Sequence, residues 1–420
     1  MSVTVSVTEI CRAAAEASAS VKQLTTARKD QVLLDMAAAV ERHRDAIAKA
    51  NEQDVGAARA AGVTPTLVDR LTLTESRMAG LVKAIHKVAS LADPVGEVVK
   101  GWTRPNGLLV EQVREPLGVI AVIYEARPNV TAEVAALCLK TGNCAVLRGS
   151  SMATATNAAI MAALAEAVAE HDEVPAAAVQ LISDPSREAA MELMRAKGYV
   201  DLLVPRGGPE LIASVERNAT VPTVIDGAGN CHTYIDATAD LDIATAVTVN
   251  AKTSRPSVCN AMETLLVHAD LAESWLPGAL ELLTEAGVEI RGDETVRRVW
   301  PKAVAATEED WGTEYLRLVL AVKVVPDAGG AIAHIRRWGT SNAEGIVAKD
   351  IDVARRFTRE VDSGSVFVNT STRYSDGGEF GYGVEIGVST QKLHVRGPMG
   401  LDALTTVKNV VWGSGQTRTL

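Results

Sequence analysis

Aromatic residues are scarce in this chain of 420 residues, where phenylalanine, tyrosine and tryptophan together make up 4%. A core with few large rings has to be filled by aliphatic and small side chains, and hydrophobic residues do account for 47% of the sequence. Charged residues make up 22%, which fits a soluble globular protein. The length exceeds what one hydrophobic core usually supports, so we expect two or more domains.

Positive charge is in deficit, because 42 lysines and arginines face 52 aspartates and glutamates and give a net charge of −10. This balance argues against nucleic-acid binding, which needs a basic face. It does not exclude an anionic small substrate, because a basic pocket can lie on an acidic protein. The N-terminal residues lack a basic segment followed by an apolar one, so they do not form a signal peptide. We see no apolar run that approaches membrane-spanning length, and we expect a cytoplasmic protein that binds no membrane.

Two common catalytic signatures are missing. None of the seven histidines lies in a His-x-x-x-His or His-Glu-x-x-His array, so we expect no metal site. No G-x-G-x-x-G motif stands between a predicted strand and helix, so the standard dinucleotide fingerprint is absent. The five cysteines are odd in number and match no metal spacing. We expect four of them to be packed in the core: Cys11, Cys138, Cys144 and Cys231.

Short apolar strands alternate with helices along most of the chain. Helical periodicity covers residues 7–91, and a predicted hairpin over 95–113 turns at the Asn-Gly of Arg104-Pro-Asn-Gly107. Strands are then predicted at 119–124, 145–148, 179–182, 200–204 and 223–225, with helices between them. Such an alternation predicts a parallel sheet covered on both faces, whose ligands bind beyond the carboxyl ends of the strands. A second alternation over residues 240–369 predicts a second α/β domain.

Cys259 is the candidate nucleophile. It lies in the polar and basic run Asn250-Ala-Lys-Thr-Ser-Arg-Pro-Ser-Val-Cys-Asn260, between a predicted helix and a predicted strand. The charges of Lys252 and Arg255 would lower the pKa of the thiol and favour the reactive thiolate. The alternative is a small buried hydrophobic residue, since cysteine is among the most buried types. This window alone does not separate the two interpretations.

Two glycine-containing turns are candidates for binding the phosphates or ribose of a cofactor. The first, Arg148-Gly149-Ser150-Ser151, follows a predicted strand and precedes a helix. The second contains Gly207 and Gly208 in Pro205-Arg-Gly-Gly-Pro209. Backbone N–H groups at a helix N-terminus bind anions well, and a fixed arginine adds charge. The alternatives are an ordinary capped helix start and a tight turn.

Four longer segments are similar to the aldehyde dehydrogenase superfamily and, within it, to the γ-glutamyl phosphate reductase family. They are Pro116-Leu-Gly-Val-Ile-Ala-Val-Ile-Tyr-Glu-Ala-Arg-Pro-Asn-Val-Thr131, Leu147-Arg-Gly-Ser150, Arg255-Pro-Ser-Val-Cys-Asn-Ala-Met-Glu-Thr-Leu-Leu-Val-His268 and Gly387-Val-Ser-Thr-Gln-Lys-Leu-His-Val-Arg-Gly-Pro-Met-Gly-Leu401. The order of predicted elements resembles that superfamily over nearly the whole chain. The resemblance favours Cys259 as the nucleophile.

The resemblance implies an aldehyde dehydrogenase-like α/β fold with two parallel-sheet domains and a β-hairpin oligomerisation arm. A discontinuous cofactor-binding domain would cover residues 1–100 and 117–228, and a catalytic domain 229–390. Residues 101–116 and 391–420 would form the arm of a homo-oligomer. The resemblance also implies a cofactor domain without G-x-G-x-x-G, which would account for the missing motif.

Site residues also follow from the resemblance. Arg148 stands where most aldehyde dehydrogenases have a lysine that touches the adenosine ribose, and an arginine there suits the 2′-phosphate of NADPH. Glu314 resembles the glutamate that holds the nicotinamide ribose, with a solvated acid as the alternative. Asn129 matches the oxyanion asparagine. Asp226 stands about where hydrolytic members carry a glutamate base, but its side chain is one methylene shorter. A reductase of an acyl phosphate needs no such base.

The implied reaction converts L-glutamyl 5-phosphate and NADPH to L-glutamate 5-semialdehyde, phosphate and NADP, in proline biosynthesis. Arg255, Arg127 and Arg373 are the candidates to pair with the phosphate and the α-carboxylate, with surface ion pairs as the alternative. Glutamate 5-kinase, which makes the labile acyl phosphate, is a candidate for transient contact. The rival functions are an NAD-dependent hydrolytic aldehyde dehydrogenase and a non-catalytic scaffold on the same fold.

Overall fold

The computed structural model describes residues 5–418, which form two compact units. Unit 1 contains the residues up to Val224, Tyr382–Ile386 and the C-terminal residues from Met399. Unit 2 contains Ile225–Gly381 and Gly387–Pro398. Each unit combines helices with a parallel sheet, so the predicted α/β class is confirmed.

Unit 1 begins with helices, as the periodicity of residues 7–91 predicted. The first starts at a capping box, in which the Ser6 side chain accepts from the backbone of Glu9 and the Glu9 carboxylate accepts from the backbone of Ser6. The second, third and fifth helices pack against later helices of the same unit. The five are α1 (Val7–Val21), α2 (Thr26–Arg42), α3 (Arg44–Ala60), α4 (Pro65–Leu71) and α5 (Glu75–Ser90).

The sheet of unit 1 has four parallel strands in the order β5-β4-β3-β6. Every residue of the central strand β3 is buried, which explains its continuous apolar sequence. The predicted strand at 223–225 was wrong, because Thr223 forms only an isolated bridge with Leu203. The strands are β3 (Val119–Tyr124), β4 (Cys144–Arg148), β5 (Val179–Leu181) and β6 (Leu202–Arg206), and the helices are α6 (Asn129–Lys140), α7 (Thr154–Ala169), α8 (Arg187–Met194) and α9 (Pro209–Asn218).

One segment of unit 1 corrects the expectation about apolar runs. Residues Ser151–Ala169, which contain α7, are long and apolar enough to cross a membrane by length and composition alone. Half of this window is buried inside the structure, and α7 packs against α2 and α3. The core helix of a soluble protein passes the same test, so the composition of α7 is explained by its packing.

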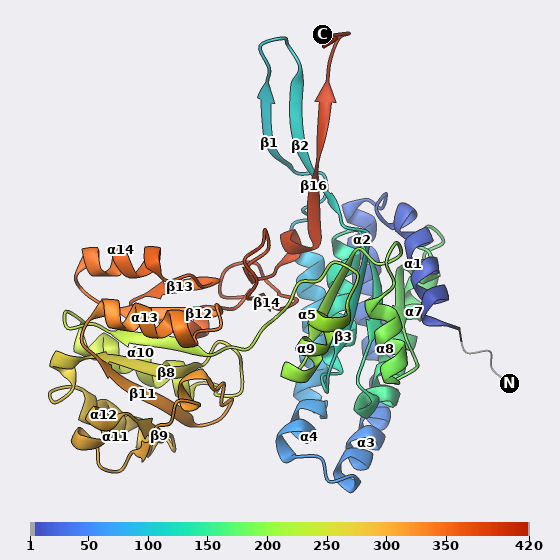
Figure 1. The fold of residues 1–420 in the computed structure, drawn as a ribbon. Coiled ribbons are helices and arrows are strands. Elements are labelled where there is room, and N and C mark those ends of the chain that lie inside the picture. The colour runs from blue at the N-terminus through green and yellow to red at the C-terminus, as the bar shows by residue number, and fades with distance from the viewer. Residues whose placement is uncertain (1–4, 419–420) are drawn as a thin grey trace. The chain divides into compact units, whose positions relative to one another are not determined.

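The predicted hairpin is present and is part of a three-stranded antiparallel sheet, which we call the arm. β1 (Val98–Thr103) pairs with β2 (Leu109–Pro116), and the turn is closed by hydrogen bonds from Arg104 N–H to the Leu108 carbonyl and from Gly107 N–H to the Arg104 carbonyl. The C-terminal strand β16 (Thr405–Trp412) pairs with the other edge of β2 along its whole length. Figure 1 shows these three strands projecting from unit 1, with the C-terminus at the tip.

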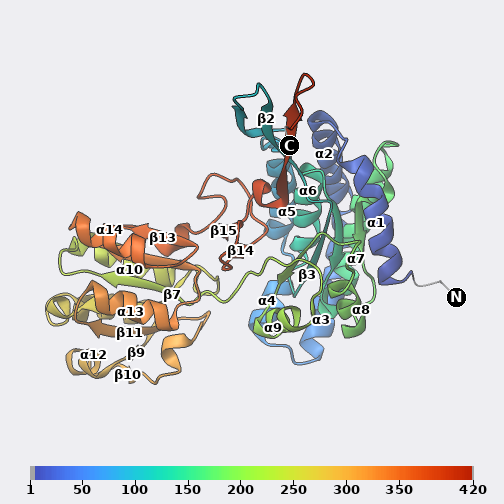
Figure 2. The same ribbon diagram turned by 45° about the horizontal axis from the view of Figure 1, so that its top comes forward.

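Unit 2 contains a seven-stranded parallel sheet in the order β10-β9-β11-β8-β7-β12-β13. α10 (Leu241–Thr253) and α11 (Leu276–Glu285) cover one face, where Val247 and Leu280 pack with Leu265 of β8. α13 (Ala328–Trp338) and α14 (Ile351–Glu360) cover the other, where Ile332 packs with Leu266. Successive residues of one strand thus point to opposite layers, and these elements can be followed in Figures 1 and 2.

The remaining elements of unit 2 include several that the sequence did not predict. Residues 269–317 contain α11, two short strands, the short helix α12 and two 3-10 turns, none of which the sequence pattern predicted. The other elements are β7 (Cys231–Ile235), β8 (Met262–His268), β9 (Glu289–Gly292), α12 (Glu294–Val299), β10 (Val304–Ala305), β11 (Val319–Val325), β12 (Ala343–Val347), β13 (Ser365–Val368) and the antiparallel pair β14 (Val388–Ser389) and β15 (Gly397–Pro398).

Candidate active site

Cys259 lies in the loop between α10 and β8 of unit 2, at the helix–strand junction that the sequence predicted. α10 is fixed at its start by Asp240, whose carboxylate accepts from the backbone N–H groups of Asp242 and Ile243. Cys259 is half-buried, whereas the four other cysteines are fully buried, as predicted. Burial raises the pKa of the Cys144 thiol to about 12. Cys259 is therefore the only cysteine of the chain with partial access to solvent.

The backbone of Gly229 fixes the position of Cys259. A Cβ atom at residue 229 would lie 1.8 Å from the Cys259 carbonyl oxygen, so only glycine fits here. The same carbonyl accepts a hydrogen bond from the Cys231 thiol at 3.2 Å. The Gly229 N–H donates to Glu314 Oε1 at 2.8 Å. Two predicted site residues, Cys259 and Glu314, are thus brought to the same glycine.

This cluster lies at the amino edge of the unit 2 sheet. Gly229 precedes β7, Cys259 precedes β8 and Glu314 precedes β11. The sequence predicted a strand at residues 223–225 and therefore placed Asp226–Gly229 at the carboxyl end of a strand. Asp226 is half-buried in the irregular segment before β7, where Thr390 N–H donates to the neighbouring Ile225 carbonyl.

Arg255 and Arg373 lie close to Cys259, as their assignment to one substrate site requires. Arg373 Nε donates to Ser254 Oγ at 3.1 Å, and its backbone carbonyl accepts from the Asn260 amide at 3.3 Å. Burial lowers the pKa of the Arg373 guanidinium, the charge of Arg255 lowers it further, and the Cys259 thiol acts in the opposite direction. Arg255 is exposed and Arg373 is half-buried, so both guanidinium groups are accessible to an anion.

The expected influence of Lys252 on the thiol was wrong. Lys252 is fully buried and forms an ion pair with Glu263, which is also fully buried. The carboxylate compensates the ammonium charge at contact distance, so little of that charge is left to stabilise a thiolate. Arg255 and Arg373 are the cations that remain near Cys259. A glutamate inside the apolar strand Met262–His268 was the signal that could have predicted a buried partner for Lys252.

In unit 1, Arg148 stands at the end of β4, but its guanidinium donates to the backbone carbonyls of Pro185 and Ser186. Gly149 is required because a Cβ atom there would lie 2.0 Å from the Asn157 side chain. The Ser150 hydroxyl accepts from the Met152 N–H at 3.2 Å, and the Ser151 side chain is exposed. The predicted turn is therefore present and leaves two hydroxyl groups at its surface.

The N-terminus of α7 is already occupied by a carboxylate. Asp54 of α3 accepts from the backbone N–H groups of Ala155 and Thr156, at 3.3 and 2.8 Å, and from the Thr156 hydroxyl. A second anion at these N–H groups would lie against the Asp54 charge. These two N–H groups are therefore taken, and binding of phosphate or ribose at the turn stays a prediction that rests on Arg148, Ser150 and Ser151.

The turn at the start of α9 has a similar arrangement. Gly208 N–H donates to Glu125 Oε2 at 2.8 Å, and a Cβ atom at Gly207 would lie 2.6 Å from the Glu125 carboxyl carbon. The Glu125 carboxylate therefore occupies the position at which the sequence predicted a pyrophosphate. Gly207 and Gly208 form the tight turn that was the alternative, and a phosphate can reach it only if Glu125 moves away.

Asn129 and Arg127 lie in unit 1, at the start of α6. The Asn129 amide donates to both carboxylate oxygens of Glu133, at 3.0 and 3.1 Å. An amide NH2 group has two N–H donors, so contact with this one carboxylate does not exclude a second acceptor. Arg127 is half-buried, and its carbonyl accepts from the Val130 N–H in the first turn of the helix.

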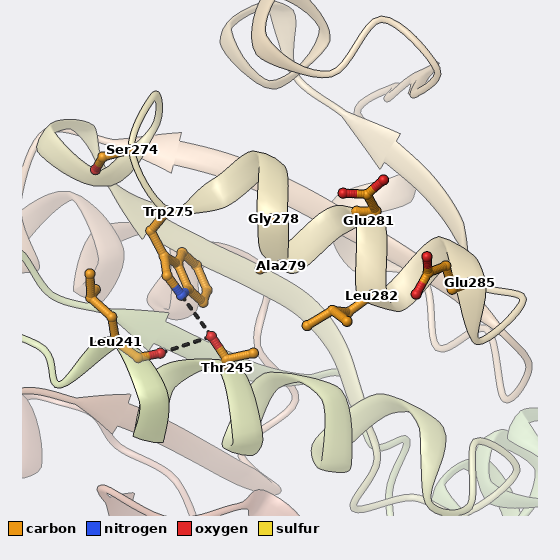
Figure 3. Close-up of a pocket in the computed structure, with 9 residues that line it drawn as sticks. All are labelled: Leu241, Thr245, Ser274, Trp275, Gly278, Ala279, Glu281, Leu282 and Glu285. Atoms are coloured by element: carbon orange, nitrogen blue, oxygen red, sulfur yellow. Dashed lines mark hydrogen bonds between the residues drawn. The ribbon is translucent and has the colours of Figure 1, made fainter.

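A groove of about 470 Å³ lies elsewhere on unit 2, between α10 and α11 (Figure 3). Trp275 forms part of its wall and donates from Nε1 to the Thr245 hydroxyl, which itself donates to the Leu241 carbonyl. Two carboxylates, Glu281 and Glu285, stand at its rim. None of the predicted site residues lines this groove.

Comparison with known proteins agrees with the fold. Residues 3–298 match the model of the aldehyde dehydrogenase family. The chain is 50% identical to a γ-glutamyl phosphate reductase of Carboxydothermus hydrogenoformans, over 98% of this chain and 99% of the relative. It is 51% identical to one of Thermobifida fusca, over 98% of each chain. The crystal structure of γ-glutamyl phosphate reductase from Thermotoga maritima has a TM-score of 0.96 at 44% identity and covers 99% of this chain and 100% of its own.

The chain therefore belongs to the aldehyde dehydrogenase family and is an oxidoreductase that acts on an aldehyde group. Its relatives at about half identity show that, within this family, it belongs with the γ-glutamyl phosphate reductases. The resemblance that the sequence motifs indicated is confirmed.

Replacing Gly229 by alanine should displace the Cys259 loop, because the added Cβ would lie 1.8 Å from the Cys259 carbonyl oxygen. We expect Gly229→Ala to lower the free energy of unfolding by about 1–3 kcal/mol, and to change the rate at which iodoacetamide alkylates Cys259. Denaturant unfolding and peptide mapping by mass spectrometry measure the two effects. The matched control is Gly278→Ala in α11, where a Cβ would meet no atom within 4 Å. Wild-type stability and thiol reactivity in Gly229→Ala would contradict the assigned role of this glycine.

Proposed function

We propose that this protein reduces L-glutamyl 5-phosphate to L-glutamate 5-semialdehyde and phosphate with NADPH, as a step of proline biosynthesis. The name of its relatives, γ-glutamyl phosphate reductase, supports this reaction. The observation that carries the proposal is the setting of Cys259. It is the only cysteine that is not buried, its carbonyl is held at Gly229, and Arg255 and Arg373 lie near it.

In the proposed mechanism, the Cys259 thiolate attacks the acyl carbon, and a carbon–sulfur bond forms as the carbonyl becomes an oxyanion. The backbone N–H of Cys259 stabilises that oxyanion, together with the Asn129 amide, whose NH2 group has two donors. The bond from the acyl carbon to the phosphate oxygen then breaks. Phosphate departs with the electron pair, so this step needs no strong general acid and leaves a thioester on Cys259.

Arg255 and Arg373 are the proposed partners of the phosphate and the α-carboxylate in unit 2, and Arg127 is a third candidate in unit 1. Positive charge near Cys259 also favours the thiolate that begins the reaction. Reduction of the thioester leaves an oxyanion on the former carbonyl oxygen. This thiohemiacetal anion collapses to the aldehyde as the thiolate leaves with the carbon–sulfur electron pair, so no proton has to be removed. No step needs a water molecule, so Asp226 has no role as a base.

The aldehyde dehydrogenase family uses a nicotinamide cofactor, and residues of unit 1 fit one. Arg148 Nε is buried and has no hydrogen-bond partner among the residues that the structure describes, so this guanidinium has a donor to offer. The hydroxyls of Ser150 and Ser151 stand beside it in sequence. When bound, the cofactor supplies the hydride that reduces the thioester. We propose that unit 1 holds the cofactor, through Arg148 and these serines, and that Glu314 of unit 2 binds the nicotinamide ribose.

The reverse reaction tests the proposal, with glutamate semialdehyde, NADP and phosphate as reactants and the NADPH absorbance as the signal. We expect turnover that requires phosphate, and Cys259→Ser should lower it by about a thousandfold or more because the thioester route is lost. Cys11→Ala, at a buried cysteine of unit 1, is the control and should retain activity. Oxidation of the aldehyde without phosphate would instead support the NAD-dependent hydrolytic enzyme, and no thiol-dependent turnover would support a scaffold.

Arg148→Ala should weaken the binding of NADPH more than the binding of NADH, because only NADPH offers a 2′-phosphate to the guanidinium. Loss of a charge-assisted hydrogen bond costs about 1.5–3 kcal/mol, or about ten- to a hundredfold in the ratio of the two dissociation constants. Measuring both cofactors separates this effect from the loss of the Arg148 bonds to Pro185 and Ser186. Arg187→Ala, at an exposed arginine nearby in sequence, should leave the ratio unchanged. Equal losses of affinity for both cofactors would show that Arg148 only holds the loop that contains Pro185 and Ser186.

The arm is the proposed surface of homo-oligomerisation. Its sheet order β1-β2-β16 leaves β1 and β16 as edge strands, and Val407, Val411 and Trp412 of β16 are 43%, 53% and 59% exposed. An exposed apolar edge strand is a template for pairing with another chain. We propose that a second copy adds to this edge. The contact with glutamate 5-kinase stays a prediction.

The variant Val407→Lys/Val411→Lys tests the arm, because it adds charge to one face of β16 without removing the strand. We expect sedimentation velocity to show a smaller species than the wild-type chain at the same concentration. Thr406→Lys, which places one added charge on the opposite face of β16, is the control for the effect of charge itself. An unchanged sedimentation coefficient in the double variant would show that β16 is not the interface.

A further inference from the structure

The loop that carries Cys259 is tied together at its two ends by a buried ion pair. Lys252 is in the last turn of α10, and Glu263 is the second residue of β8. The Lys252 ammonium donates to Glu263 Oε2, and both side chains have no exposed surface. The residues between them include Arg255, Cys259 and Asn260. The ion pair therefore closes the nucleophile loop at its base.

The second oxygen of the same carboxylate holds another part of the candidate site. Glu263 Oε1 accepts from the Leu316 N–H at 3.0 Å. Leu316 has a φ of 52°, an unfavourable conformation for a leucine that surrounding contacts must enforce. Glu314, two residues earlier, accepts from the Gly229 N–H at 2.8 Å. One carboxylate thus connects the Cys259 loop to the Glu314 segment.

The removal of both charges of this ion pair from water costs free energy, which offsets its contribution to stability. Burial raises the pKa of Glu263 to about 7 and lowers the pKa of Lys252, because both charges have left water. Buried ion pairs can often be replaced by neutral side chains of similar volume without loss of stability. The aromatic ring of Tyr315 faces Lys252, and the Tyr315 hydroxyl donates to Asp310 Oδ1 at 2.8 Å. The charges are therefore built into a network that fixes their geometry, and stability alone does not explain them.

We propose that Lys252 and Glu263 are positioning residues that hold the Cys259 loop and the Glu314 segment in register, as a single clamp. The importance of this register rests on the proposed function of Cys259. Neither side chain has exposed surface through which to meet a substrate, so both act through the backbone that they hold. A shift of about 1 Å in a reacting group can cost about a hundredfold in rate, which gives such a clamp a measurable effect.

The test separates position from stability with the neutral double variant Lys252→Met/Glu263→Gln. Glutamine keeps a carbonyl oxygen that can accept from Leu316 N–H, and methionine keeps most of the lysine volume, so no orphan charge is buried. The single variant Glu263→Gln leaves Lys252 without its partner and should melt at a lower temperature than the double variant. The double variant lacks the link between α10 and β8 although its core is filled.

A second buried pair of this chain provides the matched control. Lys29 and Asp93 in unit 1 have side chains that are 2% and 5% exposed, and Asp93 also accepts from a backbone N–H, that of Val95. Lys29→Met/Asp93→Asn therefore removes the same kind of contact from a place without site residues. It should change the melting temperature to a similar degree and leave catalysis unchanged.

Two readouts report the position of Cys259 in the double variant. We expect kcat of the phosphate-dependent reaction to fall by about tenfold or more, with KM within about twofold, since the displaced groups act on the transition state. We also expect iodoacetamide to alkylate Cys259 at least about threefold faster, because a released loop exposes a half-buried thiol more often. The alkylation needs no substrate, so it remains informative even if the proposed reaction is wrong.

Two outcomes would overturn the clamp. Wild-type kcat and wild-type alkylation in Lys252→Met/Glu263→Gln would show that the pair only fills the core. Equal changes in the Lys29→Met/Asp93→Asn control would show that any buried pair has the same effect through global stability. Altered alkylation of Cys259 together with an absence of turnover in the wild-type chain would support the clamp and contradict the proposed function.

Discussion

The site depends on one close approach, that of the Gly229 backbone to the Cys259 carbonyl. A loop between a helix and a strand has no fixed shape of its own, and the Cys259 loop takes its shape from residues far away in sequence. Gly229 leaves no room for a side chain, since a Cβ would lie 1.8 Å from the Cys259 oxygen. Its N–H also binds Glu314. The same backbone group therefore positions both the Cys259 thiol and the Glu314 carboxylate, so a displacement of either residue displaces the other.

Much of the fold could be predicted because parallel strands are buried on both faces and read as apolar runs. The strand at Val119–Tyr124 has the predicted bounds, and helices and strands alternate over residues 240–369 as predicted. The predictions failed where this signal is weak. Residues 223–225 are apolar at two positions but form a single bridge. In residues 269–317 the strands are short and carry charges such as Glu289 and Arg291, so no periodicity develops.

The candidate site was less predictable than the fold, because its electrostatics depend on distant partners. Local sequence made Lys252 a cation near the thiol, yet Glu263 compensates it from the next strand. Local sequence likewise made the start of α7 an anion site. The carboxylate that occupies it comes from Asp54, about a hundred residues earlier. The sequence of one segment shows which charged and hydrogen-bonding groups it contains. It does not show which of these groups are already paired with another segment of the chain.

The occupied helix N-termini constrain how unit 1 can recognise a cofactor. Asp54 caps α7, and Glu125 accepts from the turn before α9. In a fingerprint with G-x-G-x-x-G, backbone N–H groups of a helix N-terminus neutralise the pyrophosphate. Here the Ala155, Thr156 and Gly208 N–H groups donate to carboxylates. A phosphate therefore has to be bound by side chains, or by these N–H groups after the carboxylate has moved away. Arg148, with a buried Nε that lacks a partner among the described residues, is suited to meet that charge. In the proposed binding mode, the Arg148 side chain takes the role that backbone N–H groups have in the glycine motif.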